Sequence, residues 1–343
     1  MPRVIAVIGP TAAGKSSLGI DLARALDGEI VSADSMQLYE GMDIGTAKLP
    51  RAERGGVPHH LLGVWGIGKP ANVAEYQALA RNAIDAIAAR GRVPILVGGS
   101  GLYVRAALDN LNFPGTDPRL RERLEDELAR TGPGPLHERL AGLDPAAAAA
   151  ILPGNGRRIV RALEVIELSG ESFNATLPGY EAVYPSVQLG LRLDRAELDR
   201  RIAARVDGMW AAGFVAEVRE LERRGLREGR TSSRALGYAQ VLRFLAGDWP
   251  EQEARLETVR ATRRFARRQE SWFRRDPRIS WLDAGQGGAA GTDEAVGAAG
   301  AAGPCSGGGA GLLEAAMATI APCAEPFPST PRSSAHPQRY GAG

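Results

Sequence analysis

Cysteine is nearly absent from this sequence of 343 residues, and long apolar runs are missing altogether. The two cysteines, Cys305 and Cys323, lie in a stretch of low complexity and argue against a disulfide framework or a structural zinc site. No apolar run approaches the roughly 20 residues of a membrane-spanning helix, and the run after Arg3 is too short for a signal peptide. We therefore expect a protein without a membrane segment, located in the cytoplasm.

A strong net charge is also lacking, because 42 basic residues nearly balance 40 acidic ones. The composition, 44% hydrophobic and 24% charged, is typical of a soluble globular protein with a sizeable core. Affinity for an acidic partner must then come from local clusters of arginine rather than from the chain as a whole.

Strand and helix patterns alternate in the first part of the chain. Short β-branched runs predict buried strands, and apolar residues at helical spacing separate them. Such alternation predicts a parallel sheet with right-handed crossovers. The expected strands are 3–8, 29–32, 93–97, 187–193 and 279–282, and the expected helices between the first of them are 14–26 and 73–90.

The middle of the chain changes character, because no strand pattern occurs between about residues 116 and 184. The pairs Asp117-Pro118 and Asp144-Pro145 predict helix starts, with aspartate as N-cap and proline in the first turn. A third helix is expected at about 156–168. This segment is predicted to be a small all-helical insertion.

The C-terminal part is helical again and ends in a long arginine-rich helix at about 251–275. The Gly/Ala-rich and then Pro/Ser-rich tail is predicted to be disordered, because it buries too little apolar surface. The predicted fold is α/β, a P-loop-containing parallel sheet flanked by helices. Its predicted parts are a first core segment (1–115), the helical insertion (116–185), a second core segment with the basic helix (186–284) and the disordered tail (285–343).

A phosphate-binding loop follows the first expected strand and precedes a helix, as the motif G-x-x-x-x-G-K-[ST] requires. Backbone N–H groups of such a loop converge on an anion, a lysine adds charge, and the final hydroxyl can hold Mg²⁺. ATP hydrolysis or phosphoryl transfer is the default interpretation, but no acid ends the strand at 93–97, which runs into Gly98-Gly99-Ser100. The loop residues are Gly9, Pro10, Thr11, Ala12, Ala13, Gly14, Lys15 and Ser16.

An acid appears instead after the second strand, at Asp34. Ligands bind at the carboxyl ends of strands in open parallel sheets, so the Gly9 loop, Asp34 and Ser100 should line one crevice. A carboxylate there would repel phosphates, but it could accept a proton from an attacking nucleophile. The alternative is that Asp34 caps a helix at 35–39, and the residues alone do not separate the two interpretations.

These motifs together resemble the tRNA dimethylallyltransferases, over roughly residues 3 to 283 and in the order of that family. The bacterial type is the closer match, since no C-terminal zinc-finger spacing is present. Departures occur at Leu62, Ala239 and Ser271, where the family often has an acid, a base and threonine. The matching segments are 9–16, 34–37, 41–48, 58–61, 97–103, 157–165, 205–209, 234–238 and 267–274.

The resemblance implies an enzyme that moves a dimethylallyl group from dimethylallyl diphosphate to N6 of adenosine 37 in the anticodon loop of tRNA. A monomer is expected, although the sequence does not fix the oligomeric state. The loop would hold the diphosphate with Mg²⁺ on Ser16, and Asp34 would take the N6 proton. Lys15, Ser16 and Arg205 would stabilise the departing diphosphate, and Ser100 would keep a hydroxyl near the reacting centre. The residues implied in tRNA binding are Asp34, Ser35, Met36, Gln37, Ser100, Arg121, Arg157, Arg158, Arg161, Arg234, Arg264, Arg267, Arg268 and Arg274.

The arginine-rich helix supports an RNA partner independently. At 3.6 residues per turn its arginines from 260 to 275 fall within an arc of about 140°, while Phe265, Trp272 and Phe273 fall opposite and should pack on the core. Few acids accompany the arginines, so phosphate contact is favoured over a solvated, salt-bridged face. The alternatives are an adenylate isopentenyltransferase, an ATP-dependent small-molecule kinase, and an RNA-binding protein with a nucleotide switch.

Overall fold

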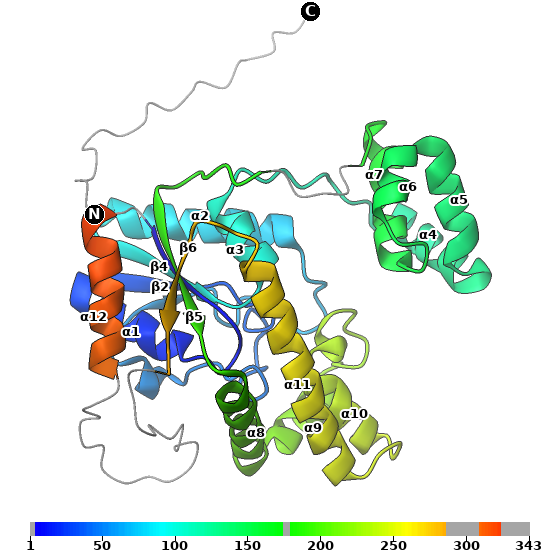
Figure 1. Ribbon diagram of the computed structural model, residues 1–343. Coiled ribbons are helices and arrows are strands. Elements are labelled where there is room, and N and C mark those ends of the chain that lie inside the picture. The colour runs from blue at the N-terminus through cyan, green and yellow to red at the C-terminus, as the bar shows by residue number, and fades with distance from the viewer. Residues whose placement is uncertain (1–3, 174–178, 286–308, 324–343) are drawn as a thin grey trace, which may run out of the picture. The chain divides into compact units, whose positions relative to one another are not determined.

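The computed structural model describes residues 4–173, 179–285 and 309–323 (Figure 1). The chain divides into two compact units. The first comprises Met1–Ala71, Leu79–Val104 and Tyr184–Gly343, and the second comprises Asn72–Ala78 and Arg105–Val183. No helix in the part of the chain described has both the length and the apolarity that crossing a bilayer requires.

The first unit is built on a parallel six-stranded sheet of order β3-β2-β4-β1-β5-β6, which confirms the predicted fold class. All five residues of β1 are buried, and it pairs on one side with β4 and on the other with β5. Strand β3 was not predicted, because a strand of two residues is too short to show an alternating pattern of apolar and polar side chains. The strands are β1 (Val4–Ile8), β2 (Gly28–Ser32), β3 (His59–His60), β4 (Val93–Gly98), β5 (Ser186–Arg192) and β6 (Ile279–Asp283).

Helices cover this sheet and extend the unit. Helix α1 packs on β2 and β4 through Leu18 and Leu22, and α11 contributes Ala266 to the same core. The helices are α1 (Lys15–Leu26), α2 (Val73–Ala89), α3 (Gly101–Leu108), α8 (Arg195–Ala211), α9 (Phe214–Arg223), α10 (Tyr238–Leu245), α11 (Glu251–Phe273) and α12 (Gly309–Ile320). Helices α2 and α3 each begin in one unit and end in the other. Short 3₁₀ turns lie at Arg51–Arg54, Ser232–Arg234 and Ala321–Cys323.

Helix α12 corrects the prediction of a disordered tail from residue 285. It lies beside α1 (Figure 1), and Ala316 and Ile320 are buried in the core, with Leu312, Leu313 and Met317 packed against it. These residues recur at helical spacing, a pattern that the Gly/Ala-rich composition of the segment obscures. The prediction of disorder is therefore wrong for 309–323, and its remainder lies outside the described residues.

The second unit contains α4 (Pro118–Thr131), α5 (Pro133–Leu143), α6 (Pro145–Ala150) and α7 (Gly156–Ser169). The side chain of Asp117 accepts hydrogen bonds from the first turn of α4, and that of Asp144 does the same for α6, as predicted. A leucine-rich core joins the helices. Helix α5 was not predicted, because its N-cap is Gly132 and no side chain marks the start.

Candidate active site

The phosphate-binding loop joins β1 to α1, and three of its residues have positive φ angles. Gly9 and Gly14 have φ of +139° and +90°, and Ala12 has φ of +63°, which is strained for a residue with a side chain. A Cβ atom on Gly9 would lie 2.7 Å from the carbonyl oxygen of Leu191 on β5, so only glycine fits there. The loop ends at the N-terminus of α1, where helix N–H groups favour an anion.

Lys15 is the first residue of α1, and its Nζ donates a hydrogen bond of 2.6 Å to the carbonyl oxygen of Pro10 in the same loop. Loss of hydration, and then repulsion from the charge of Arg205, lower the pKa of Lys15 to about 7, although the charge of Asp34 opposes the shift. The two charges lie close enough to Lys15 to act on it. The structure therefore brings Lys15, Asp34 and Arg205, three residues singled out in the sequence, to one place.

Asp34 follows β2 and faces this site. Its Oδ1 accepts a hydrogen bond of 2.9 Å from the backbone N–H of Met36, so the carboxylate does cap a local turn. No helix forms at 35–39, so Asp34 caps a turn and not the helix expected there, while its role as base stays a prediction. The charge of Asp34 also contributes, after burial and Tyr39, to raising the pKa of Tyr103. The charge of Asp34 thus acts on both Lys15 and Tyr103.

Ser100 joins the end of β4 to the segment after β2. Its backbone N–H donates to the carbonyl oxygen of Ala33 at 3.2 Å, and its Oγ accepts from the backbone N–H of Ser35 at the same distance. The ends of β1, β2 and β4 are adjacent in the sheet, so the residues that follow these strands lie at one edge, because the carboxyl ends of parallel strands meet there.

Two residues that the sequence did not single out organise this region. Glu217 on α9 accepts hydrogen bonds from the backbone N–H groups of Asp43, Ile44 and Gly45, at 3.1, 2.7 and 3.3 Å, and from the hydroxyl of Tyr238. Gln269 on α11 connects the phosphate-binding loop to the end of β4. Neither contact has a local signature in the sequence.

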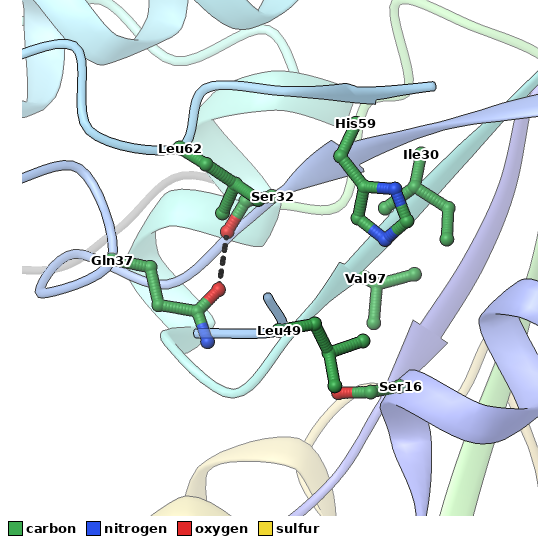
Figure 2. A pocket seen from close by; sticks show the side chains of 8 residues that line it. All are labelled: Ser16, Ile30, Ser32, Gln37, Leu49, His59, Leu62 and Val97. Atoms are coloured by element: carbon green, nitrogen blue, oxygen red, sulfur yellow. Dashed lines mark hydrogen bonds between the residues drawn. The ribbon is translucent and has the colours of Figure 1, made fainter. Parts of the chain in front are cut away.

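A small cavity of about 30 Å³ lies beside Ser16, the last residue of the phosphate-binding motif (Figure 2). It has room for roughly two water molecules. Ser32 donates a hydrogen bond of 3.1 Å to Oε1 of Gln37 at its edge, and the Nε2 of Gln37 donates to the carbonyl oxygen of Thr46. The cavity is lined by Ser16, Ile30, Ser32, Gln37, Leu49, His59, Leu62 and Val97.

The adjacent histidines take separate roles. His59 lines the cavity, with Nδ1 2.8 Å from the carbonyl oxygen of Val57, and burial lowers its pKa. His60 points to the buried carboxylate of Glu29, at 2.6 Å. No group of three or more metal-ligating side chains occurs among the residues described.

The arginine-rich helix α11 divides into two halves. In the first half, Arg260 pairs with Glu253 and Glu257, and Arg264 also pairs with Glu257. The expectation that few acids accompany the arginines is therefore wrong for this half. Toward the end of the helix, Arg267, Arg268 and Arg274 are exposed. None of the three forms a salt bridge with another residue that the structure describes.

The aromatic side of α11 is only partly buried. Phe273 is 3% exposed, as expected of a core residue, but Trp272 is 37% exposed and lies against the backbone of Gly101. The prediction that Trp272 packs in the core is therefore wrong: its indole packs at the surface, and it approaches the backbone of Gly101 closely because that residue has no side chain.

In the second unit, the buried carboxylate of Glu164 binds two of the arginines expected to contact tRNA. Arg121 and Arg161 approach it at 2.5 and 2.7 Å. Burial would raise the pKa of Glu164, but hydrogen bonds from Arg121, Thr116 and Arg161 lower it overall. Arg157 and Arg158 are exposed at the start of α7, and in the first unit Arg234 is exposed. Whether these arginines bind RNA remains a prediction.

The fold and this site define a class of protein: an α/β protein whose first strand leads into a phosphate-binding loop with a lysine, and whose second, parallel strand leads to an aspartate that acts on the charge of that lysine. Residues 37–276 match the sequence profile of the IPP transferase family. The chain belongs to that family, which confirms the resemblance found in its motifs.

Relatives and solved structures agree with this assignment. The chain is 70% identical over 281 residues to the tRNA dimethylallyltransferase of Streptomyces avermitilis, covering 82% of this chain and 90% of that protein. It is 70% identical over 285 residues to that of Salinispora arenicola, covering 83% of each.

Among solved structures, the tRNA isopentenylpyrophosphate transferase of Bacillus halodurans is 41% identical with a TM-score of 0.61, covering 82% of this chain and 90% of that one. A eukaryotic dimethylallyltransferase acting on tRNA is 27% identical with a TM-score of 0.67, covering 82% and 73%.

Proposed function

We propose that this protein transfers the dimethylallyl group of dimethylallyl diphosphate to N6 of adenosine 37 in the anticodon loop of tRNA. One observation carries the proposal for the site: the phosphate-binding loop follows β1 and Asp34 follows β2, and the ends of these two parallel strands flank that of β4 at one edge of the sheet. A diphosphate held by the loop would therefore lie next to a proton acceptor. The names of the relatives indicate the group that is transferred, dimethylallyl, and the molecule that receives it, tRNA.

The loop, the N-terminus of α1, Lys15 and Arg205 would bind the diphosphate end of the donor. The leaving group departs only if its negative charge is neutralised, and fixed cations and backbone N–H groups supply that stabilisation where the charge develops. The charge of Arg205 acts on Lys15 in the free protein and lowers its pKa, so a diphosphate between the two cations would relieve their mutual repulsion.

Mg²⁺ fits this arrangement as a cofactor. The hydroxyl of Ser16 is exposed in the first turn of α1, at the end of the loop. Mg²⁺ usually takes one or two protein ligands, with waters and phosphate oxygens completing its coordination. Ser16 would be that protein ligand, and the ion would neutralise part of the diphosphate charge.

In the transfer, the lone pair of N6 attacks C1 of the allylic group as the C1–O bond breaks, and the diphosphate leaves with the bonding electrons. The N6 proton passes to the carboxylate of Asp34. Ser100, which is hydrogen-bonded to Ser35, holds the segment that carries this base. Positioning both substrates in line supplies a large part of the rate acceleration.

The tRNA would bind along the exposed arginines of α11 with further contacts from Arg157, Arg158, Arg234 and the segment 34–37. The guanidinium group of arginine can donate two hydrogen bonds to the oxygens of one phosphate. The target adenosine must leave its stack to reach the crevice, as other base-modifying enzymes require. We place this reaction in the cytoplasm and expect the protein to act as a monomer.

Purified protein incubated with labelled dimethylallyl diphosphate, Mg²⁺ and either unmodified tRNA or AMP tests the proposal. We expect label in the tRNA at adenosine 37. Label in AMP would identify an adenylate isopentenyltransferase, and consumption of ATP without label transfer would identify a kinase; either result would overturn the proposal.

A further inference from the structure

Gln269 on α11 lies between the two loops that would carry the donor and the base. The side chain is buried, with the residue 5% exposed. Its Oε1 accepts a hydrogen bond of 2.9 Å from the backbone N–H of Thr11 in the phosphate-binding loop. Its Nε2 donates a hydrogen bond of 2.9 Å to the carbonyl oxygen of Gly99 at the end of β4. One amide group therefore ties the two loops together.

The polarity of the partners fixes the orientation of this amide. Thr11 offers a donor and needs the oxygen, while Gly99 offers an acceptor and needs the nitrogen. A Cβ atom at residue 99 would lie 2.2 Å from Nε2, so the amide reaches this backbone only because residue 99 is glycine. Of the common side chains, a neutral amide or carboxylic acid of this length has both an acceptor and a donor to offer.

The loops that Gln269 joins have different tasks in the proposed function. Thr11 belongs to the loop that would hold the diphosphate. Gly99 precedes Ser100, whose hydrogen bonds to Ala33 and Ser35 hold the segment containing Asp34. The distance between the leaving group and the base therefore depends on a bridge that α11 provides.

We propose that Gln269 is a positioning residue for the transfer, setting the phosphate-binding loop and the Asp34 segment at the separation that the reaction requires. This inference rests on the proposed function. Gln269 touches neither reacting group, so its loss should slow the chemical step more than it weakens binding. A displacement of about 1 Å between reacting groups can cost about a hundredfold in rate.

Gln269→Met keeps the length of the side chain and removes both hydrogen bonds. We expect the single-turnover rate per bound donor to fall by about 10- to 100-fold, with the Kd values for donor and tRNA within about threefold of wild type. Gln252→Met, on the exposed first turn of the same helix, is the matched control and should leave the rate unchanged. A rate for Gln269→Met within about twofold of wild type would overturn the inference.

Gln269→Glu separates a hydrogen-bonding role from simple packing. An ionised carboxylate cannot donate to Gly99, but a protonated one restores both bonds. The rate of this variant, divided by the wild-type rate at the same pH, should rise by at least about fivefold from pH 8 to pH 6. The same ratio for Gln269→Met should stay constant. A flat ratio for Gln269→Glu would overturn the inference.

Hydrogen exchange gives a readout that does not need transfer. The Thr11 amide should be protected in the wild-type protein and should exchange at least about tenfold faster in Gln269→Met, because its acceptor is lost. If wild type transfers no label to tRNA, the proposed function fails while this measurement still decides on the bridge. Equal exchange in the two proteins would overturn it.

Discussion

Proton uptake by Lys15 should accompany binding of the donor's diphosphate. In the ligand-free protein, loss of hydration and the charge of Arg205 lower the pKa of Lys15 to about 7. A diphosphate beside the ammonium group favours its charged form, so the pKa rises on binding. Well below pH 7 the lysine is charged in both states and takes up almost no proton. Above pH 7 it must gain a proton for binding, so affinity falls as the pH increases.

The size of the effect follows from that pKa. At pH 8 about nine tenths of the Lys15 side chains are neutral before binding, and at pH 6 only about one tenth are. Binding should therefore take up about 0.9 proton at this site at pH 8 and about 0.1 at pH 6. The affinity should weaken by up to about tenfold per pH unit above pH 7, which is about 1.4 kcal/mol.

Calorimetry with inorganic pyrophosphate, in buffers of different ionisation enthalpy, measures the number of protons taken up. Pyrophosphate titrates as well, so Lys15→Arg serves as the control because a guanidinium stays charged throughout this range. The wild type should exceed the control by about 0.9 proton at pH 8. Equal uptake in the two proteins at pH 8 would refute the reasoning.

A direct titration covers the case in which Lys15→Arg binds too weakly. Lysine Nζ resonances of the free protein report the ionisation of Lys15 without any ligand. A resonance that titrates near the usual pKa of 10.5 would refute the argument. The variant Lys15→Met should have a higher free energy of unfolding than wild type at pH 7. The reason is that folding removes the Lys15 ammonium group from water, which stabilises its charge better than the protein does.

Four other changes test separate parts of the protein. Asp34→Asn should lower the single-turnover rate by about 10²- to 10⁴-fold, with tRNA affinity from filter binding nearly intact; equal loss of tRNA binding would remove its role as base. Changing Arg267 and Arg268 to Gln should weaken tRNA binding and reduce its salt slope by about 2. Arg264→Gln should do less, because a carboxylate already pairs with it; an identical effect would argue for another RNA surface. Glu217→Ala should lower the free energy of unfolding in urea by about 2 kcal/mol, and an unchanged midpoint would mean that water replaces the carboxylate.

Local patterns predicted most of the sheet and the central part of the site. The strand ends could be located from short β-branched runs, and parallel pairing then brings the residues after them to one edge. This is why Lys15, Asp34 and Ser100 could be grouped from the sequence. The helix starts at Asp117 and Asp144 were predictable for a similar reason, since an N-cap acts within its own turn.

Contacts between distant residues could not be predicted in this way. Gln269 lies 258 positions from Thr11, and Glu217 lies 174 positions from Asp43, so no window of sequence contains both partners. The pairing of Arg264 was missed for another reason, because its carboxylate partner lies two turns away, beyond the nearest helical neighbours.

The central place of β1 in the sheet has a consequence for synthesis of the protein. One neighbour of this first strand is β5, whose residues leave the ribosome after more than half of the chain. At about 5–20 residues per second, the nascent chain waits on the order of 10–40 s with one edge of β1 unpaired. An unpaired apolar edge invites pairing with other chains, so chaperones that shield nascent polypeptides should matter most for this protein during that interval.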